Sequence, residues 1–359
     1  MQKSRNDFLN ELASKKIKYN LGAGVPPLDL YPNLNLEKYF AGFNIISNQD
    51  LIGYHHTTGL IQKAASIFLE VNEGLTVDSD NIVISNGVQE AITLTISLFR
   101  NSTLACLDPS YPGFEDAAAT FGCKVKKLKN VNWIKQIEKL PEGSLFYLSS
   151  DFSNPEGYSI SIEDRNKLVE IAEKNKFFIF DDATYRPFNL DVSFPSLLSL
   201  NSDYVIHAVS FSKFLAPGLR TAFIYIPQSL KSGFVRSKSN ISLNNSGITQ
   251  FIIKRWLEEN NYSLKKQLNA IKQRLIANRE ITRKFNISYN GGFFCTIALD
   301  KDADYTFCEK LLENEKIAVI PMELFTQEKR YKNQLRLCIA NIDAEKLDLV
   351  LNKIIKFIA

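Results

Sequence analysis

The sequence predicts an α/β protein with a large domain built on a mainly parallel sheet and a smaller α+β domain. Two observations indicate this fold. From about residue 60, compact apolar runs alternate with segments of helical period, separated by short turns. After residue 245 this alternation gives way to a long charged helical stretch followed by short apolar runs. We therefore expect a large domain over residues 46–245 and a small domain formed by residues 1–45 and 246–359.

The elements of the large domain follow one another in strict alternation. Helical period extends over residues 60–73, 87–99, 113–121 and 161–175. Apolar runs that predict buried strands occupy residues 82–85, 103–107, 144–149, 177–181, 204–209 and 221–226. Because strands joined through helices run parallel with right-handed crossovers, we expect helices on both faces of one sheet.

The last third of the chain has a different pattern. One charged helical stretch is predicted through Arg255 to Arg283, and the turn-prone segment Asn286 to Gly292 ends it. Short apolar runs then alternate with helical segments, the runs at 293–298, 316–320 and 334–340 and the helices at 303–314 and 343–358.

Composition excludes several classes of function. The net charge of +4, from 43 basic and 39 acidic residues, is too small to indicate nucleic-acid or membrane binding. The five cysteines are scattered without a C-x-x-C pair, which predicts reduced thiols and no structural metal: Cys106, Cys123, Cys295, Cys308 and Cys338. The N-terminal residues have no apolar signal core, so we expect a cytoplasmic protein.

Polar or aromatic groups follow five of the predicted strands. Parallel sheets bind ligands at the carboxyl ends of their strands, so these groups are candidates for one site. They are Asn86-Gly87, Asp108 to Tyr111, Asn154-Pro155, Asp182, and Ser210 to Lys213.

The segment Ser210-Phe-Ser-Lys213-Phe-Leu-Ala-Pro-Gly-Leu-Arg220 carries the most chemical information. A lysine at the end of a buried strand has its amine pKa depressed, which makes the amine a nucleophile toward a carbonyl cofactor. Two hydroxyls and the guanidinium of Arg220 suit a phosphate. An isolated Ser-x-Ser-Lys match usually marks a surface loop. A reactive amine beside a phosphate site makes pyridoxal 5′-phosphate the first cofactor to test.

This segment resembles the S-[FL]-S-K-x-L-A-P-G-L-R signature of pyridoxal-phosphate enzymes of fold type I, the aspartate aminotransferase superfamily. The wording is nearest to the branch of 2-aminoadipate aminotransferase and the aminotransferase-like regulators. The resemblance extends from about Gly22 to the last helix and implies a seven-stranded sheet in the large domain. It also implies that Lys213 anchors the cofactor and moves the substrate Cα proton.

Two further motifs of the family occur at strand ends. In Asp182-Ala-Thr-Tyr185 the resemblance implies that Asp182 pairs with the cofactor's ring nitrogen and that Tyr185 bonds its 3′-oxygen; Asp181 is a lesser candidate for the acid. In Asn154-Pro-Glu156-Gly, which resembles N-P-[TS]-G, Asn154 holds the 3′-oxygen near the substrate carboxylate. Glu156 departs from the motif, and its charge suggests a neutral or cationic substrate side chain.

Other positions complete the implied site. Gly87, Val88 and Gln89 resemble a phosphate-binding G-x-Q turn that opens a helix, where free N–H groups face an anion. The resemblance adds Ser210, Ser212 and Arg220 to the phosphate, Tyr111 stacked on the ring, Tyr54 from the partner subunit of a homodimer, and Arg336 and Gly24 at the substrate. Met322 replaces a glycine of the family, which is expected either to narrow the space near the substrate side chain or to change the backbone of that loop.

The resemblance implies an aminotransferase that moves an amino group between an L-amino acid and a 2-oxo acid. A lyase, cyclase or oxidase of a specialised pathway shares the same cofactor residues and stays open as the alternative. A ligand-sensing regulator is disfavoured, because about 45 residues precede the cofactor domain, too few for a winged helix. His55 and His56 are expected to pack or hydrogen-bond locally rather than bind a metal.

Overall fold

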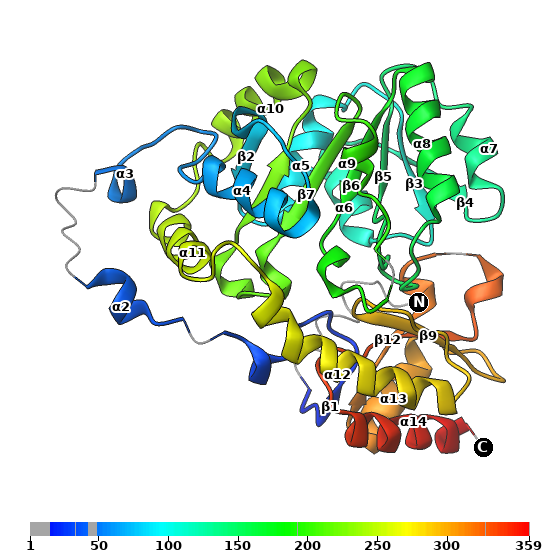
Figure 1. Cartoon of the computed structure of the whole chain (residues 1–359). Helices are drawn as coiled ribbons and strands as arrows, with labels where there is room; N and C mark the ends of the chain where they lie inside the picture. The colour runs from blue at the N-terminus through cyan, green and yellow to red at the C-terminus, as the bar shows by residue number, and fades with distance from the viewer. Residues whose placement is uncertain (1–14, 33, 42–48, 192, 327, 359) are drawn as a thin grey trace.

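The structure, a computed structural model, describes residues 15–32, 34–41, 49–191, 193–326 and 328–358 (Figure 1). Its main sheet has seven strands in the order β2-β8-β7-β6-β5-β3-β4. Only β8 pairs antiparallel with its neighbours in this sheet, so the mainly parallel, seven-stranded fold is confirmed. The strands are β2 Ile82–Ser85, β3 Leu104–Asp108, β4 Val125–Lys129, β5 Leu145–Leu148, β6 Phe178–Asp182, β7 Val205–Ser210 and β8 Ala222–Tyr225.

Helices cover both faces of this sheet because alternate strand residues enter two separate cores. In β5, Phe146 and Leu148 belong to one core, whereas Leu145 and Tyr147 belong to the other. The first core is closed by α4 Gln62–Glu73, α7 Trp133–Ile137, α8 Ile162–Asn175 and α9 Leu197–Leu200. The second is closed by α5 Val88–Leu98, α6 Pro112–Thr120 and α10 Gln228–Ile241.

A second group of elements lies below the main sheet in Figure 1. The antiparallel strands β11 Ile320–Pro321, β12 Gln334–Cys338 and β9 Phe294–Ala298 form its sheet. The short β1 Tyr19–Asn20 pairs with β10 Ile317–Ala318, so the start of the described chain joins the C-terminal part. Its helices are α12 Lys265–Lys284, α13 Tyr305–Glu315 and α14 Ala344–Ile358. The domain boundaries given above stay a prediction.

The structure differs from the sequence prediction at several elements: the helices α7, α9 and α10 were not predicted, and two further differences have a local cause. The strand β4 was not predicted, because this edge strand is Val-Lys-Lys-Leu-Lys and only Leu128 is fully buried. The single helix expected through Arg255 to Arg283 is two helices, α11 Gly247–Glu259 and α12. Asn261 and Tyr262 adopt left-handed backbone angles (φ 48° and 60°) that no α-helix contains, and they turn the chain between the two.

Within the described part of the chain, no helix is both long and apolar enough to cross a membrane. Two shorter helices, α2 Leu36–Phe40 and α3 Gln49–Ile52, extend away from the sheet on the side of α11 (Figure 1).

Candidate active site

A cavity of about 330 Å³ lies at the carboxyl ends of β6 and β7. It brings together every cofactor and substrate residue predicted from the sequence except Gly87 and Tyr54. It also contains Ser149, Thr184, Pro217 and Phe294, which were not predicted. The lining residues are Gly24, Val88, Gln89, Tyr111, Ser149, Asn154, Asp182, Thr184, Tyr185, Ser210, Ser212, Lys213, Pro217, Arg220, Phe294 and Arg336.

Lys213 stands at the end of a short 3-10 turn, Phe211–Lys213, that directly follows β7. Its Nζ donates a hydrogen bond of 2.6 Å to the carbonyl of Gly24 and lies 5.8 Å from the centre of the Tyr185 ring. Burial lowers the pKa of this amine from its ordinary value, because the charged form loses hydration. The fold therefore favours the unprotonated, nucleophilic amine that the sequence predicted at this position.

Asp182 ends β6, and its buried carboxylate accepts three hydrogen bonds. The Tyr147 hydroxyl donates at 2.9 Å, and the Thr184 backbone N–H and hydroxyl donate to the other oxygen. Burial raises the pKa of Asp182, and the bonds from Thr184 and Tyr147 oppose that rise. A cationic ring nitrogen beside it would favour the ionised form further. Tyr147 is fully buried in β5, and no sequence motif marked it.

Asp181, the lesser candidate for this role, does not line the cavity. Successive residues of a strand point to opposite faces, so Asp181 faces the other core. There its carboxylate lies 3.1 Å from His207 Nδ1 and accepts a bond of 3.2 Å from the Ser150 N–H. Asp181 thus belongs to a buried charge cluster behind the sheet.

The start of α5 and Arg220 form a polar cradle beside Ser210 and Ser212. Gly87, the N-cap of α5, has φ 81°, and a Cβ there would lie 2.6 Å from Arg220 Nη2. Glycine at this position therefore leaves the space that the guanidinium occupies. Arg220 donates to Ser212 Oγ at 3.4 Å and to the Asn86 carbonyl at 3.2 Å. In the described part of the chain it has no acidic partner, as expected of a phosphate ligand.

Arg336 comes from β12 and is buried at the opposite end of the cavity. Its Nη1 donates to Asn154 Oδ1 at 3.1 Å, and its Nη2 bonds the Gly22 carbonyl. The rings of Phe294 and Phe325 lie 4.5 and 5.2 Å from the guanidinium carbon. Burial lowers its pKa. Among the described residues its Nε has no hydrogen-bond partner, which leaves a buried donor for an anionic ligand.

A second cavity of about 230 Å³ adjoins the first and shares Tyr111, Asn154 and Arg336 with it. Its remaining wall is mainly apolar, and Arg336 is the only basic residue among the described residues that line it. The other lining residues are Gly22, Pro112, Gly113, Asp116, Ile320, Leu324 and Phe325.

Glu156 and Met322, two departures from the family motifs, line neither cavity. The Glu156 carboxylate accepts bonds from Asn130 at 2.8 Å and from the Tyr331 hydroxyl at 3.0 Å, and burial raises its pKa. Glu156 therefore joins the Asn-Pro loop to the segment before β12. Because its carboxylate faces neither cavity, it does not support a preference for a cationic substrate side chain. Met322 is fully buried in the core and contributes no wall to either cavity.

Tyr54 lies outside the cavity of its own chain. Its side chain is 86% exposed and borders a separate groove with residues 244–247. Of the two neighbouring histidines, His55 lies 2.9 Å through Nδ1 from the adjacent His56 carbonyl and 2.8 Å through Nε2 from the carbonyl of Asn245, which is 190 positions away in the sequence.

The chain resembles known proteins over most of its length. Residues 16–354 match the family described as aminotransferase class I and II. The (S)-3,5-dihydroxyphenylglycine transaminase of Amycolatopsis orientalis is 25% identical over 387 residues, covering 95% of this chain and 88% of that protein. The HTH-type transcriptional regulator YdeF of Bacillus subtilis is 27% identical over 238 residues. That match covers 64% of this chain and about half (51%) of the regulator.

Solved structures share the fold at low sequence identity. The multiple substrate aminotransferase of Thermococcus profundus superposes with a TM-score of 0.87 at 21% identity, covering 100% of this chain and 95% of that one. The α-aminoadipate aminotransferase LysN of Thermus thermophilus, solved with N-(5′-phosphopyridoxyl)-L-leucine, gives 0.83 at 22% identity, covering 98% and 94%.

Proposed function

We propose a function for this chain, which belongs to the class I and II aminotransferases. The cavity at Lys213 binds pyridoxal 5′-phosphate, and the protein transfers the amino group of an L-amino acid to a 2-oxo acid. The observation that carries the proposal is the meeting of Lys213, Asp182 and Arg336 in one cavity of about 330 Å³. These residues supply a nucleophilic amine, a buried acid and a carboxylate clamp.

The residues of the cavity fit this cofactor. The N–H groups that open α5, with Ser210, Ser212 and the unpaired Arg220, suit its phosphate. Asp182 suits the ring nitrogen, while Tyr185 and Asn154 suit the 3′-oxygen and Tyr111 the ring face. When bound, the cofactor supplies an electron sink for the charge that develops at the substrate Cα.

The side chains of the chain itself move the proton and hold the substrate. Lys213 Nζ, whose pKa is lowered by burial, accepts the proton from Cα and returns it to the neighbouring carbon. Arg336 binds the α-carboxylate, using the Nε that has no other partner in the described residues, while Asn154 holds its Nη1 in place. Held in this way, the substrate presents its Cα–H to the amine.

The second cavity supports a preference for an uncharged substrate side chain. It opens beside Arg336, and its wall is built mainly from Pro112, Ile320, Leu324 and Phe325. Among the residues that the structure describes, no basic side chain other than Arg336 lines it to neutralise a distal carboxylate, and Asp116 would repel one. We therefore expect apolar or aromatic amino acids to be better substrates than aspartate, glutamate or 2-aminoadipate.

The exposed Tyr54 supports a homodimer in which each subunit completes the other's phosphate site. Its side chain is 86% exposed and lies outside its own cavity. Three apolar side chains near this groove are also exposed. Ile52 lines the groove itself, and Leu243 and Ile248 directly precede and follow its residues 244–247. An apolar surface of this kind suits a second copy of the chain.

A half-reaction with stoichiometric holoenzyme tests the function. A panel of amino acids, supplied without an acceptor, should yield about one equivalent of 2-oxo acid per site, and turnover should resume only when a 2-oxo acid is added. Ammonia, hydrogen peroxide or a released side-chain fragment would instead identify the lyase or oxidase alternative.

The clamp has its own test. Arg336→Lys keeps the charge but loses the paired donors, so KM for the amino acid should rise roughly 100-fold, with a smaller change in kcat. Arg330→Lys is the matched control, because Arg330 lies outside both cavities. An unchanged KM in Arg336→Lys would show that the substrate carboxylate does not bind at Arg336.

A further inference from the structure

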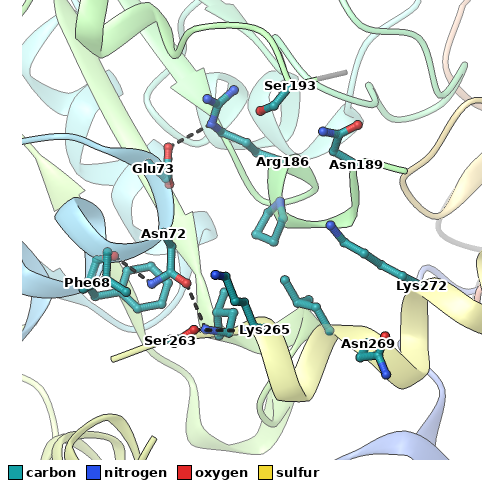
Figure 2. A pocket seen from close by; sticks show the side chains of 14 residues that line it. Phe68, Asn72, Glu73, Arg186, Asn189, Ser193, Ser263, Lys265, Asn269 and Lys272 are labelled. Carbon is teal, nitrogen blue, oxygen red and sulfur yellow. Dashed lines mark hydrogen bonds and ion pairs between the residues drawn. The ribbon is translucent and has the colours of Figure 1, made fainter. Parts of the chain in front are cut away.

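A separate cavity of about 570 Å³, larger than the one at Lys213, opens between α4, α12 and the segment after β6 (Figure 2). The two cavities have no lining residue in common. We propose that this cavity beside α12 binds a small organic anion that carries an apolar body and about two negative charges. The inference does not depend on the reaction proposed above.

One wall of the cavity is a single face of α12. Lys265, Leu268, Asn269 and Lys272 follow the i, i+3, i+4, i+7 spacing, so they lie along one side of the helix. Figure 2 shows the side chains of Lys265 and Lys272 extending from the helix toward the opposite wall. Two helical turns separate them, about 10 Å along the axis. Neither lysine has an ion pair within the described part of the chain.

The opposite wall does not neutralise these lysines. Its acid, Glu73, is already paired with Arg186 Nε at 2.9 Å and with His207 Nε2 at 3.3 Å (Figure 2). Arg186 also pairs with Asp151 at 2.8 Å. The charges of this wall therefore cancel among themselves, and the two ammonium groups leave the cavity with a net positive charge.

The desolvation of one lysine agrees with this picture. Burial lowers the pKa of Lys272, and no nearby acid restores it. An anionic ligand would supply the missing counter-charge. Phe68, Leu264, Leu268 and Pro187 add apolar surface to the cavity, so a ligand with an aliphatic or aromatic body is favoured over a bare inorganic ion.

The position of the cavity separates it from the chemistry. Arg186 immediately follows Tyr185, yet the two side chains line different cavities. An occupant beside α12 would therefore leave the cofactor and the amino acid in place. Occupancy of one cavity should therefore not affect occupancy of the other.

Calorimetric titration of phenyl phosphate into holoenzyme tests the proposal. Bound cofactor fills the phosphate cradle at Arg220, and a constant ionic strength removes general salt effects. We expect saturable binding of one phenyl phosphate per chain. Lys265→Gln and Lys272→Gln should each weaken it about tenfold, the value of one charge-assisted hydrogen bond. Lys266→Gln is the matched control, since this exposed neighbour on α12 lies outside the cavity.

Three outcomes would overturn the site. Binding that survives both Lys265→Gln and Lys272→Gln would place the anion elsewhere. An equal loss in Lys266→Gln would show attraction to a basic surface only. Competition between phenyl phosphate and the amino-acid substrate would assign the binding to Arg336. Benzyl alcohol, which has the ring without the charge, should bind at least tenfold more weakly.

Discussion

At the scale of single residues, the acid of the site depends on a neighbour from another strand. The Tyr147 hydroxyl donates to Asp182 Oδ2 at 2.9 Å from the adjacent strand β5. This bond favours the ionised carboxylate against the cost of burial. Tyr147 does not line the cavity, so we expect it to act by positioning Asp182.

Removal of the Tyr147 hydroxyl should therefore affect the reaction more than binding of the amino acid. In Tyr147→Phe the pKa of Asp182 rises further, so the ring nitrogen is held less firmly protonated, and kcat should fall about tenfold with little change in KM. Steady-state kinetics across pH measures both.

Tyr289→Phe is the control for lost stability. Its buried hydroxyl donates to the Gly292 carbonyl at 2.7 Å outside the cavity. Both variants should lose about 1 kcal/mol of unfolding free energy, but only Tyr147→Phe should lose kcat. Equal kcat values in the two variants would argue that the bond to Asp182 has no role in the reaction.

Lys213 gives the second prediction at this scale. Borohydride should fix the cofactor covalently to the wild-type chain at Lys213 and should fix none to Lys213→Ala, because no other lysine in the described part of the chain lines the cavity. Peptide mass spectrometry locates the attachment. A cofactor-bearing peptide from another lysine in Lys213→Ala would reassign the anchor.

At the scale of elements, β6, β7 and α4 are joined behind the site by buried charges. Asp181 and His207 are register partners on β6 and β7, and Glu73 reaches His207 from the end of α4. Burial lowers the pKa of His207, but the Glu73 and Asp181 carboxylates outweigh it and raise the pKa to about 9 from 6.5. The imidazole is therefore doubly protonated in the folded protein at neutral pH.

This cluster predicts a specific pH dependence of stability. Below pH 6.5 both folded and unfolded chains hold the His207 proton; between 6.5 and about 9 only the folded chain does. The stabilisation is therefore complete below pH 6.5 and is lost as pH rises through about 9. It amounts to roughly 3 kcal/mol.

Urea unfolding of wild type and His207→Asn from pH 6 to 10 measures the effect. The destabilisation of His207→Asn should be largest at pH 6 and should shrink toward pH 10. Parallel stability curves for the two proteins would show that His207 holds the same proton in both states.

At the scale of the whole molecule, the site forms where distant segments meet. Arg336 and Phe294 come from the antiparallel sheet, Gly24 from near the start of the described chain, and Lys213 from the main sheet. Lys213 Nζ bonds the Gly24 carbonyl at 2.6 Å and Arg336 bonds Asn154 at 3.1 Å. These two hydrogen bonds join segments that are far apart in the sequence at the wall of the cavity.

The proposed homodimer can be tested by complementation. Lys213→Ala and Tyr54→Ala should each lower activity, but mixing the unfolded parents and refolding them together should recover about a quarter of wild-type activity. Each hybrid dimer then has one site with both residues intact. Activity that never exceeds the mean of the two parents would place Tyr54 outside the partner's site.

The sequence by itself determined the order of strands and helices and the residues at the strand ends. Both are local properties: apolar period fixes an element, and a motif such as Ser210 to Arg220 fixes the chemistry of the loop that follows it. For this reason Asp182, Asn154 and Lys213 were found without a structure, and all three line the same cavity.

Tertiary structure alone decided which groups face one another. Tyr147 meets Asp182, and His207 meets Asp181, only through strand pairing, which joins residues 35 and 26 positions apart. The hydrogen bond from the Tyr331 hydroxyl to the Glu156 carboxylate joins residues that are 175 positions apart. The face of α12 that carries Lys265 and Lys272 likewise acquires its cavity only when the helix lies beside α4 and the segment after β6. Such contacts depend on register and packing between segments, which no local pattern encodes.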